Sequence, residues 1–475
     1  MGYVYTICQE AGENVSNIAF NSKTNLIEQS VYKYSLQDVD KPNLYRELFP
    51  YSEVPRISFN HRIVPMNVPD DIWITDTTFR DGQQSREPYT TEQMTYIYEK
   101  LHEMDNGAGL IRQTEFFLYS KQDRDAAMKC LEKGYEFPQV TSWIRAKKED
   151  FKLVKELGIK ETGILVSCSD YHIFKKLNMK RSQAMAQYLG VVEEALDNGI
   201  IPRCHLEDLT RADYYGFVLP FVTELMKMSK QSGIPIKIRA CDTMGLGVSI
   251  PGVALPRSVP GIMYGLTHYA DVPSRCIEWH GHNDFYRAVS NSTAAWLYGA
   301  SAVNTSLFGI GERTGNCPLE AMIIEYMQLR GEDKGMNLQV LTEIAEYFER
   351  EIGYKVPPMT PFVGKSFNLT KAGIHADGIL KDEEIYNNFD TEKILNRPIA
   401  VAVDSHSGVA GIAAWINLHY GLRDVYRVSK KDSAVLRIKD WVDRQYEGNR
   451  TTIMSDDEME KAVEKYMPYL KHNVD

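Results

Sequence analysis

The sequence has no stretch that is long and apolar enough to span a membrane. Its N-terminus also lacks the basic region and apolar core of a secretion signal. The seven cysteines are scattered along the chain and form no Cys-x-x-Cys pair, and their number is odd. This pattern argues against a disulfide framework and is typical of a reducing compartment. We therefore expect a cytoplasmic protein with no membrane partner.

An excess of positive charge is also missing. The chain has 64 Asp and Glu residues against 54 Lys and Arg residues, a formal net charge of -10 at pH 7. No nucleic acid partner is expected, because binding to a phosphate backbone requires a basic surface. The composition, 43% hydrophobic and 25% charged, is otherwise that of a globular protein. The length of 475 residues allows two or three domains, or one large barrel with additions.

Short runs rich in β-branched and aromatic residues alternate with longer amphipathic segments from about residue 72 onward. Eight strand–helix units are the number found in a (β/α)8 barrel, whereas a doubly wound sheet, the alternative, seldom needs eight. The predicted strands are Ile72–Thr77, Leu110–Leu118, Gln139–Arg145, Gly163–Ser169, Ile201–Glu207, Ile236–Asp242, Cys276–His282 and Val303–Phe308. Helical patterns lie between them, for example at Thr91–Met104, Arg181–Asn198, Tyr214–Ser229 and Phe285–Tyr298.

The fold class we predict is α/β, with residues 71–332 forming a (β/α)8 TIM barrel. Residues 1–70 would form an N-terminal extension packed on the barrel. Residues 333–475 lose the strand rhythm and are predicted to form a mostly helical C-terminal region. Outside the barrel, helical patterns occur at residues 24–34, 336–354 and 407–419, and beyond about residue 430.

Two histidines, His280 and His282, stand two residues apart at the end of a predicted strand. Because side chains on a strand alternate between its faces, both imidazoles should point the same way and could form half of a metal site. Gly281 between them would leave room for a ligand. Such a pair is about as often explained by hydrogen bonds between the histidines or to backbone carbonyls, so the pair alone does not decide.

Polar residues lie at the end of nearly every predicted strand, and in a barrel these ends meet at the face that carries the active site. Burying so many ionisable groups around one axis would be costly without a ligand or metal to pair with them. Asp81, His280 and His282 offer a carboxylate and two imidazoles, and Asn316 adds a neutral oxygen. This donor set suits Mg²⁺, Mn²⁺, Co²⁺ or Zn²⁺, any of which could act as a Lewis acid. The other polar residues at strand ends are Asp76, Arg80, Arg145, Ser167, Ser169, His172, His205, Glu207, Asp208, Arg211, Asp242 and Thr243.

The loop after the eighth predicted strand contains Gly309, Gly311 and Gly315. Barrels often hold a phosphate at this place, so the loop is a candidate phosphate site. Its spacing differs from the dinucleotide-binding fingerprint. The need for a tight turn would explain the same glycines.

Three separated segments resemble the signatures of the 2-isopropylmalate synthase and homocitrate synthase family. They are Asp76–Gln84, His280–Asp284 and Gly311–Asn316, and each lies at a predicted strand end. Ala372–Gly378 and His406–Gly408 resemble the segment that follows the barrel in this family. The resemblance implies a metal-dependent Claisen condensation of acetyl-CoA with a 2-oxo acid on a (β/α)8 barrel.

The resemblance also implies roles for individual residues. Asp81, His280 and His282 would bind a divalent metal, with Asn316 as a weaker ligand. Mn²⁺ is the ion we expect first, and Mg²⁺, Co²⁺ and Zn²⁺ are the alternatives. Arg80 would stabilise the enolate formed from the acetyl thioester.

Glu207 and His375 would handle the proton that leaves the methyl group. In the family, the histidine after the barrel reaches the active site of the neighbouring subunit, so a homodimer is implied. Arg145 could grip a distal carboxylate with both ends of its guanidinium group. The remaining implied contacts are Thr243, Gln84, His172 and His406 for the 2-oxo acid and Gly309, Gly311 and Gly315 for CoA.

The chain departs from the common pattern of the family in several places. Its second strand reads Arg112–Phe117 in place of a Glu–Gly–Phe–Pro pattern, Gln83 stands where Glu is common, and the N-terminal extension is long. These features, with Val401–Gly408, look most like the members that condense acetyl-CoA with oxaloacetate, a 2-oxo dicarboxylic acid. The alternatives are homocitrate, citramalate and 2-isopropylmalate synthases, the related lyases and aldolases, and a barrel that keeps its metal but only binds a partner.

Overall fold

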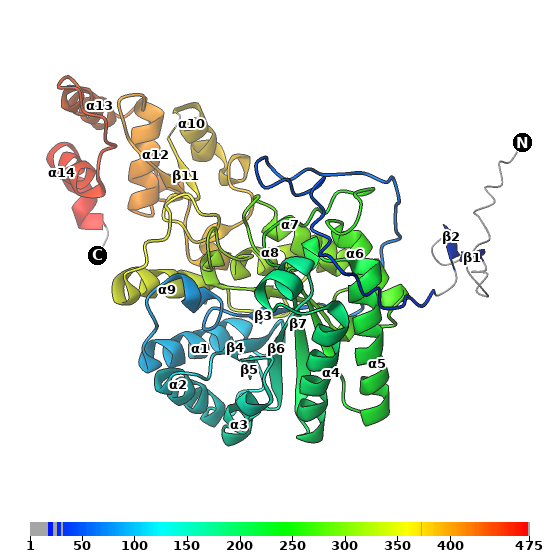
Figure 1. The fold of residues 1–475 in the computed structure, drawn as a ribbon. Helices are drawn as coiled ribbons and strands as arrows, with labels where there is room; N and C mark the ends of the chain where they lie inside the picture. The colour runs from blue at the N-terminus through cyan, green and yellow to red at the C-terminus, as the bar shows by residue number, and fades with distance from the viewer. Residues whose placement is uncertain (1–17, 22–25, 30–31, 372, 474–475) are drawn as a thin grey trace, which may run out of the picture. The chain divides into compact units, whose positions relative to one another are not determined.

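The computed structural model describes residues 18–21, 26–29, 32–371 and 373–473 (Figure 1). The chain divides into two compact units. The first consists of the chain up to Tyr98 together with Gly107–Lys334, and the second of Glu99–Asn106 and Gly335–Asp475. Within the described ranges, no helix has the length and apolar character needed to cross a membrane.

The first unit is a closed barrel of eight parallel strands, as predicted. The strands are neighbours in chain order, and the last of them closes the barrel by pairing with the first. All eight predicted strands are confirmed, with small differences at their ends. They are β3 (Trp73–Asp76), β4 (Ile111–Phe116), β5 (Gln139–Arg145), β6 (Glu161–Ser167), β7 (Ile201–Glu207), β8 (Lys237–Asp242), β9 (Ile277–Gly281) and β10 (Ala302–Thr305).

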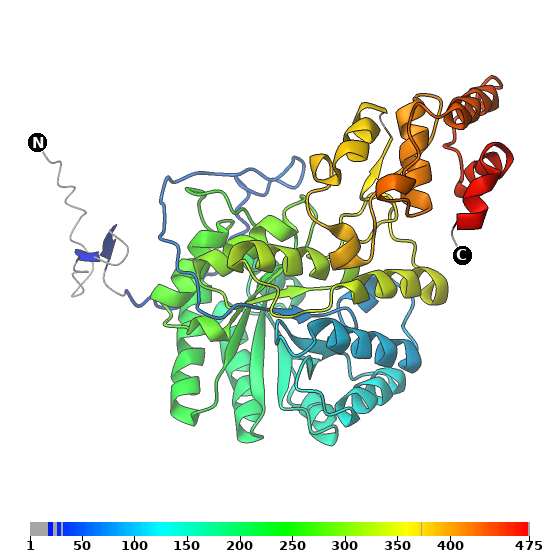
Figure 2. The ribbon, with the colours of Figure 1, turned by 180° about the vertical axis from the view of Figure 1, so that it is seen from behind.

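Helices connect the strands and cover the outside of the barrel (Figures 1 and 2). The predicted helix at Tyr214–Ser229 begins with a π-helical turn over Tyr214–Val218 and continues as α5, which ends at a left-handed glycine, Gly233. The helices are α1 (Thr91–Asp105), α2 (Lys121–Glu132), α3 (Phe151–Glu156), α4 (Arg181–Asp197), α5 (Leu219–Ser232), α6 (Val259–His268), α7 (Ala288–Tyr298) and α8 (Leu319–Arg330).

The strands carry apolar side chains on one face and polar ones on the other. In β7, Cys204 and Leu206 are buried on the outer face, while Arg203 and His205 point to the barrel axis. Arg203 shows the direction clearly, because it donates a hydrogen bond to Glu115 on β4, across the barrel interior. The interior of such barrels is usually filled by branched apolar side chains. Here the interior is largely filled by charged side chains, which lie directly below the C-terminal ends of the strands.

The second unit is mostly helical, as predicted. Its core gathers apolar residues of three helices, among them Ile412, Trp415, Val435, Ile438 and Met459. Helix α14 begins with a capping box in which Ser455 and Glu458 bond each other's backbone amides. The elements are α9 (Gln339–Tyr347), α10 (Gly373–Lys381), α11 (Thr391–Leu395), α12 (Val409–His419), α13 (Ser433–Gln445), α14 (Asp456–Tyr466) and the parallel strands β11 (Leu369–Thr370) and β12 (Ala400–Val401).

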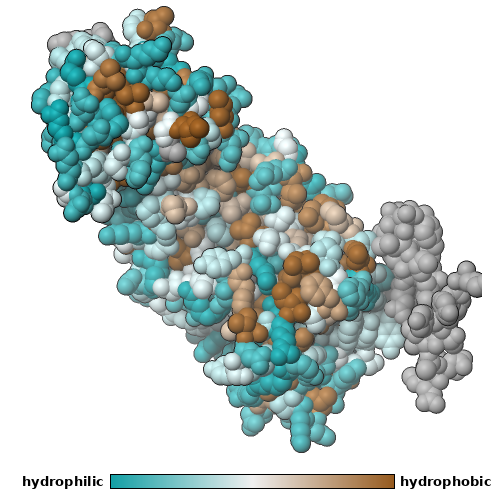
Figure 3. Space-filling model, turned by 90° about the horizontal axis from the view of Figure 1, so that it is seen from above, coloured by the Kyte–Doolittle hydropathy of each residue, from teal (hydrophilic) through white to brown (hydrophobic). Residues whose placement is uncertain are grey.

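One helical expectation is wrong. Within the pattern at residues 24–34, Leu26–Gln29 form strand β2, which pairs with β1 (Ile18–Asn21) in antiparallel fashion. A short helical pattern carries little intrinsic free energy, so pairing with a neighbouring segment outweighs it. The surface in Figure 3 is mainly hydrophilic, with hydrophobic residues in scattered groups between the polar ones.

Candidate metal centre

Asp81, His280 and His282 converge at the C-terminal end of the barrel. The Oδ2 atom of Asp81 lies 4.0 Å from Nε2 of His280 and 3.6 Å from Nε2 of His282. The two imidazole nitrogens are 3.3 Å apart. Across the described ranges, this is the one group of at least three His, Cys, Asp or Glu residues whose ligand atoms all lie within 4.8 Å of one another. The pairing of the two histidines predicted from their spacing is present.

The residues fit a bound cation because buried acceptors in the cluster are left without a donor. Asp81 Oδ2 and Asn316 Oδ1 are buried and have no hydrogen-bond partner among the described residues. The amide nitrogen of Asn316 donates to the carbonyl of Ile310 at 3.3 Å, and this bond orients the amide oxygen. Orphaned buried acceptors of this kind are rare unless an ion or a water molecule pairs with them. The chain therefore contains a possible divalent metal site.

The surroundings of the cluster keep all three ligands unprotonated. Burial would raise the pKa of Asp81, but Arg80 and the two histidines hold it well below its usual range. Burial lowers the pKa of His280 to about 3 and also lowers the pKa of His282. Both imidazoles are therefore neutral at pH 7, so a cation would not have to displace protons from them.

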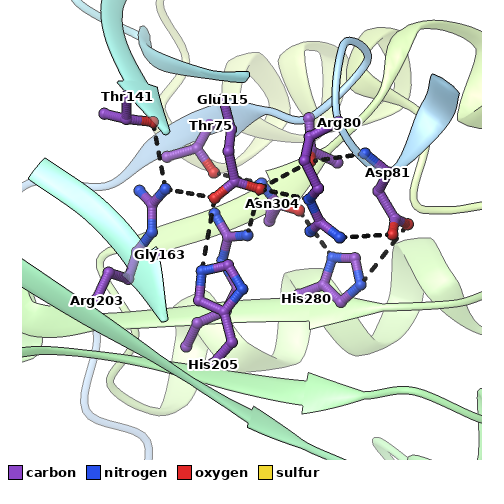
Figure 4. A network of polar contacts seen from close by, with 12 residues as sticks. Thr75, Arg80, Asp81, Glu115, Thr141, Gly163, Arg203, His205, His280 and Asn304 are labelled. Carbon is purple, nitrogen blue, oxygen red and sulfur yellow. Dashed lines mark hydrogen bonds and ion pairs between the residues drawn. The ribbon is translucent and has the colours of Figure 1, made fainter. Parts of the chain in front are cut away.

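A chain of hydrogen bonds fixes the orientation of His280. Its Nδ1 atom lies 2.7 Å from Oδ1 of Asn304, and the amide nitrogen of Asn304 donates to Thr75 at 2.8 Å. Thr75 in turn donates to Glu278. The amide oxygen of Asn304 must therefore accept, so Nδ1 carries the proton and Nε2 offers its lone pair toward Asp81. Figure 4 shows His280 between Asn304 and Asp81.

This arrangement predicts how Asn304 controls metal affinity. Asn304→Ala should weaken Mn²⁺ binding by roughly 10- to 100-fold, because the imidazole loses the acceptor that sets its tautomer. Asn304→Asp keeps an acceptor at the same place and should bind Mn²⁺ more tightly than the alanine variant. Titration calorimetry of both variants checks this. Equal losses in the two variants would show that the Asn304 oxygen does not orient His280.

Arg80 is held beside the cluster on three sides. Its Nε donates to Glu115 at 2.7 Å, and its Nη1 donates to Oδ1 of Asp81 at 2.8 Å. The ring of Trp143 lies 5.8 Å from the centre of the guanidinium group. In the described part of the chain, no residue accepts a hydrogen bond from the remaining nitrogen, Nη2. A fixed guanidinium group with a free nitrogen next to a candidate metal ligand can stabilise an oxyanion.

Glu115 is the centre of a buried ionic network under the metal cluster (Figure 4). It accepts hydrogen bonds from Arg80, from Arg203 at 2.6 Å and from Arg239 at 3.0 Å. Burial raises the pKa of Glu115, but these arginines hold it well below its usual range. Arg239 also donates to Glu278 at 2.6 Å. The network ties the guanidinium group of Arg80 to the strands on the far side of the barrel.

The motifs of the sequence do not predict this network. Glu115 lies in the second-strand segment that departs from the family pattern, and Arg203, Arg239 and Glu278 belong to none of the motifs. The sequence does contain a signal for a polar barrel interior. Glu278 stands two residues before His280 on β9, and Arg203 stands two residues before His205 on β7, so each pair lies on one face of its strand. Charged residues on one face of a buried strand indicate a polar barrel interior.

Glu207 and His172 are brought together near the end of β7. The Nδ1 atom of His172 lies 3.2 Å from Oε2 of Glu207, which also accepts from Ser167. Lys176 lies 3.3 Å from the same oxygen. Burial would raise the pKa of Glu207, but His172, Ser167 and Lys176 together lower it to about 2. The carboxylate is therefore ionised and firmly held, which makes it a weak base in this state.

The comparisons with known proteins decide the family. The family model described as HMGL-like matches residues 71–348. The chain belongs to the HMGL-like family. It is 64% identical over 437 residues to the citrate (Re)-synthase of Clostridium kluyveri, with 92% of this chain and 96% of that protein covered. It is 55% identical to the citrate (Re)-synthase of Syntrophus aciditrophicus, covering 92% and 70% of the two chains.

A third relative performs a differently named reaction. The chain is 36% identical to the 2-phosphinomethylmalate synthase of Streptomyces hygroscopicus, over 91% of this chain and 98% of that protein. The HMGL-like assignment and these synthases confirm the family expected from the motifs.

In this HMGL-like barrel, Thr243 lies next to the Glu207 loop. Its hydroxyl accepts a hydrogen bond from the backbone amide of Asp208 at 2.8 Å, and its carbonyl accepts one from Arg313. Arg313 also donates to Asp284, at 2.8 Å, directly after the metal motif. The loops after β8, β9 and β10 are thus joined, and Thr243 is held close to the Glu207–His172 pair.

Arg145 is not brought to the metal cluster of the HMGL-like barrel. It shares a strand face with Trp143, but both ends of its guanidinium group bond Asp150, each at 2.8 Å. The ring of Tyr119 lies 5.0 Å from the guanidinium centre, and 52% of the side chain is exposed. A grip on a substrate carboxylate would require the Asp150 pair to open. Gln84 is exposed in the short helical turn Gly82–Ser85 after Asp81, the candidate metal ligand.

The glycines of the loop after β10 are required by the backbone path of that loop. A Cβ atom on Gly311 would collide with the side chain of Asn316, and one on Gly315, which has a φ of 91°, would collide with the carbonyl of Gly309. The amide of Asn316 donates to that same carbonyl at 2.9 Å. The turn therefore places Asn316 beside the candidate metal ligands, and contact of these glycines with CoA stays a prediction.

His375 and His406 lie in the second unit. His375 is exposed in the first turn of α10 and packs on the ring of Tyr386, with ring centres 4.3 Å apart. The side chain of His406 is 90% exposed. A Cβ atom on Gly373 would lie 3.5 Å from the amide of Gly408, so the two motifs after the barrel are neighbours within this unit.

Proposed function

We propose that the protein is a citrate (Re)-synthase, an enzyme that condenses acetyl-CoA with oxaloacetate and releases citrate and CoA. The observation that supports it most is the buried Asp81, His280 and His282 cluster with Arg80 at its side, in a chain 64% and 55% identical to two citrate (Re)-synthases. We also propose that it works as a cytoplasmic homodimer with Mn²⁺.

The barrel residues would prepare the 2-oxo acid. A divalent ion held by Asp81, His280 and His282, with Asn316 as a further ligand, would supply Lewis-acid polarisation of the ketone of oxaloacetate. Thr243 and His172 would hold the rest of this substrate. Arg145 would reach its distal carboxylate only in a state in which the Asp150 pair is open.

The enolate of acetyl-CoA would be handled by Arg80, Glu207 and His375. Because His172, Ser167 and Lys176 already hold the Glu207 carboxylate, we assign removal of the methyl proton to His375 of the neighbouring subunit and the orientation of that imidazole to Glu207. The free Nη2 of Arg80 would bond the enolate oxygen. The enolate carbon then forms a bond to the ketone carbon, the ketone oxygen takes up a proton, and water cleaves the thioester to citrate and CoA.

The experiment that tests this function is CoA release from acetyl-CoA by metal-stripped protein. Oxaloacetate, 2-oxoglutarate, pyruvate and 2-oxoisovalerate are each added with and without Mn²⁺. We expect release that requires both oxaloacetate and metal. Release with another 2-oxo acid alone would replace the substrate and keep the chemistry. Absence of release with all four would contradict the condensation.

Arg80→Lys tests the oxyanion role. We expect kcat to fall by about 10²- to 10³-fold, because the donors of an ammonium group sit on one atom and cannot reproduce the planar spread by which the guanidinium group reaches Glu115 through Nε and Asp81 through Nη1 while Nη2 faces the enolate. Arg423→Lys, at a guanidinium group that is 76% exposed and pairs with Glu392, is the matched control and should keep full activity. Circular dichroism checks that both variants are folded. Near-normal turnover of Arg80→Lys would remove this role from Arg80.

A further inference from the structure

Residues 37–46, called the strap below, lie on the loop that carries His172. The strap belongs to residues 32–70, the part of the N-terminal extension that runs beside the barrel helices in Figures 1 and 2. The backbone amide of Asn43 donates to Oδ2 of Asp170 at 2.7 Å, and the hydroxyl of Tyr171 donates to the carbonyl of Leu44 at 2.8 Å. These two bonds fasten the strap to the two residues before His172.

A buried ion cluster makes the attachment firm. Arg181 is fully buried at the start of α4 and donates to both oxygens of Asp170, at 2.9 and 2.7 Å. Its third nitrogen donates to Asp213 at 2.9 Å and to the carbonyl of Gln37 at 3.0 Å. The strap thus supplies one of the acceptors that a buried guanidinium group requires.

The strap also bonds the loop after β7. The amide of Gln37 donates to the carbonyl of Gly216 at 2.8 Å. A Cβ atom at Gly216 would lie 3.0 Å from the side-chain oxygen of Gln37 and even closer to Asp213, so glycine is needed for this approach. The strap therefore joins the loop that carries His172 to the loop that follows Glu207 and Asp208.

The element held in this way carries a site residue. Asp170 precedes the π-helical turn Tyr171–Lys176, and turns of this kind are frequent at functional sites. Within that turn, His172 lies 3.2 Å from Glu207 through Nδ1 and 3.6 Å from Asp208 through Nε2. A displacement of the turn would separate His172 from both carboxylates.

We propose that the strap is a positioning element, which acts through Asp170 and Arg181 to hold His172 against Glu207 before the 2-oxo acid binds. Asp170 and Arg181 are then positioning residues for the condensation, and the N-terminal extension has a role in it. A substrate that meets a prepared pair does not have to order the loop itself, and this lowers its apparent dissociation constant. The kinetic part of this proposal rests on the function proposed above.

A matched pair of variants at Asn43 tests the strap. Asn43→Pro removes the backbone N–H that donates to Asp170, whereas Asn43→Ala keeps it. We expect Asn43→Pro to raise the KM for oxaloacetate about tenfold, the effect of losing one hydrogen bond to a charged group, with the KM for acetyl-CoA unchanged. Both variants lose the hydrogen bond that the Asn43 side-chain oxygen accepts from the amide of Tyr45 at 3.1 Å, so Asn43→Ala controls for that loss and should raise the KM for oxaloacetate far less than Asn43→Pro does. Tyr171→Phe, which loses only its bond to Leu44, should change the KM for oxaloacetate in the same direction.

Two further measurements separate positioning from general destabilisation. In a His172→Ala background, Asn43→Pro should add no further change to the KM for oxaloacetate, because the two changes act on one interaction. Additive effects in this cycle would overturn the proposal. Amide hydrogen exchange over residues 171–177 should be at least about tenfold faster in Asn43→Pro than in Asn43→Ala.

Equal exchange in the two Asn43 variants would show that the strap does not hold the loop, whatever the kinetics. If the full-length chain releases no CoA from oxaloacetate, the proposed function fails, and the exchange measurement still decides whether the strap fixes the turn. If Asn43→Pro does not fold, Tyr171→Phe takes its place in both measurements.

Discussion

Asp81→Asn should reduce turnover by at least about 10³-fold, since Lewis-acid polarisation is worth several kcal/mol and 1.36 kcal/mol corresponds to a factor of ten. The asparagine can still accept the hydrogen bond that Arg80 donates to Oδ1. It removes the negative charge that faces His280 and His282, at 4.0 and 3.6 Å. The variant should therefore keep its fold and lose its metal.

Metal content by elemental analysis and CoA release in the presence of added Mn²⁺ check this expectation. Asp76→Asn is the control from the same motif. Asp76 is fully buried, bonds Thr78 and Thr114, and burial raises its pKa to about 6. Its neutral replacement should affect stability more than metal content. A full complement of metal in Asp81→Asn would mean that the ion binds elsewhere.

The fold could be predicted from the sequence because its signals are local. The barrel strands are short segments with apolar residues at alternate positions, and helical patterns lie between them, so the number of strand–helix units can be read from periodicity. The metal cluster could be predicted for the same reason. The two-residue spacing of His280 and His282 and the position of Asp81 after a strand end are both local properties of the sequence.

Partners across the barrel could not be predicted in the same way. Arg203 on β7 meets Glu115 on β4, 88 residues earlier in the chain, and only the closure of the barrel brings them together. Arg145 shows the opposite difficulty. Its partner Asp150 is only five residues away, but the irregular turn between them gives no periodic signal.

Glu115→Gln should have the second large effect, on stability. Removing one partner of a buried ionic network leaves uncompensated charge and costs about 3–5 kcal/mol. Here three guanidinium groups, those of Arg80, Arg203 and Arg239, would share one neutral amide. We expect a lower midpoint of urea unfolding, which tryptophan fluorescence measures. Glu92→Gln, which breaks an exposed pair with Lys129, should leave the midpoint unchanged.

The pH dependence of the stability difference between the unmodified chain and Glu115→Gln shows whether the charge of Glu115 causes it. The pKa of Glu115 in the folded state lies well below its usual range, so its contribution to stability is complete above the unfolded-state pKa, about 4. The contribution is lost as the pH falls from that value toward the folded-state pKa. The gap in unfolding free energy between the unmodified chain and Glu115→Gln should be constant from pH 8 to about 5 and shrink below about pH 4. A gap that stays the same at low pH would show that the loss comes from altered packing and that the charge of Glu115 does not stabilise the barrel.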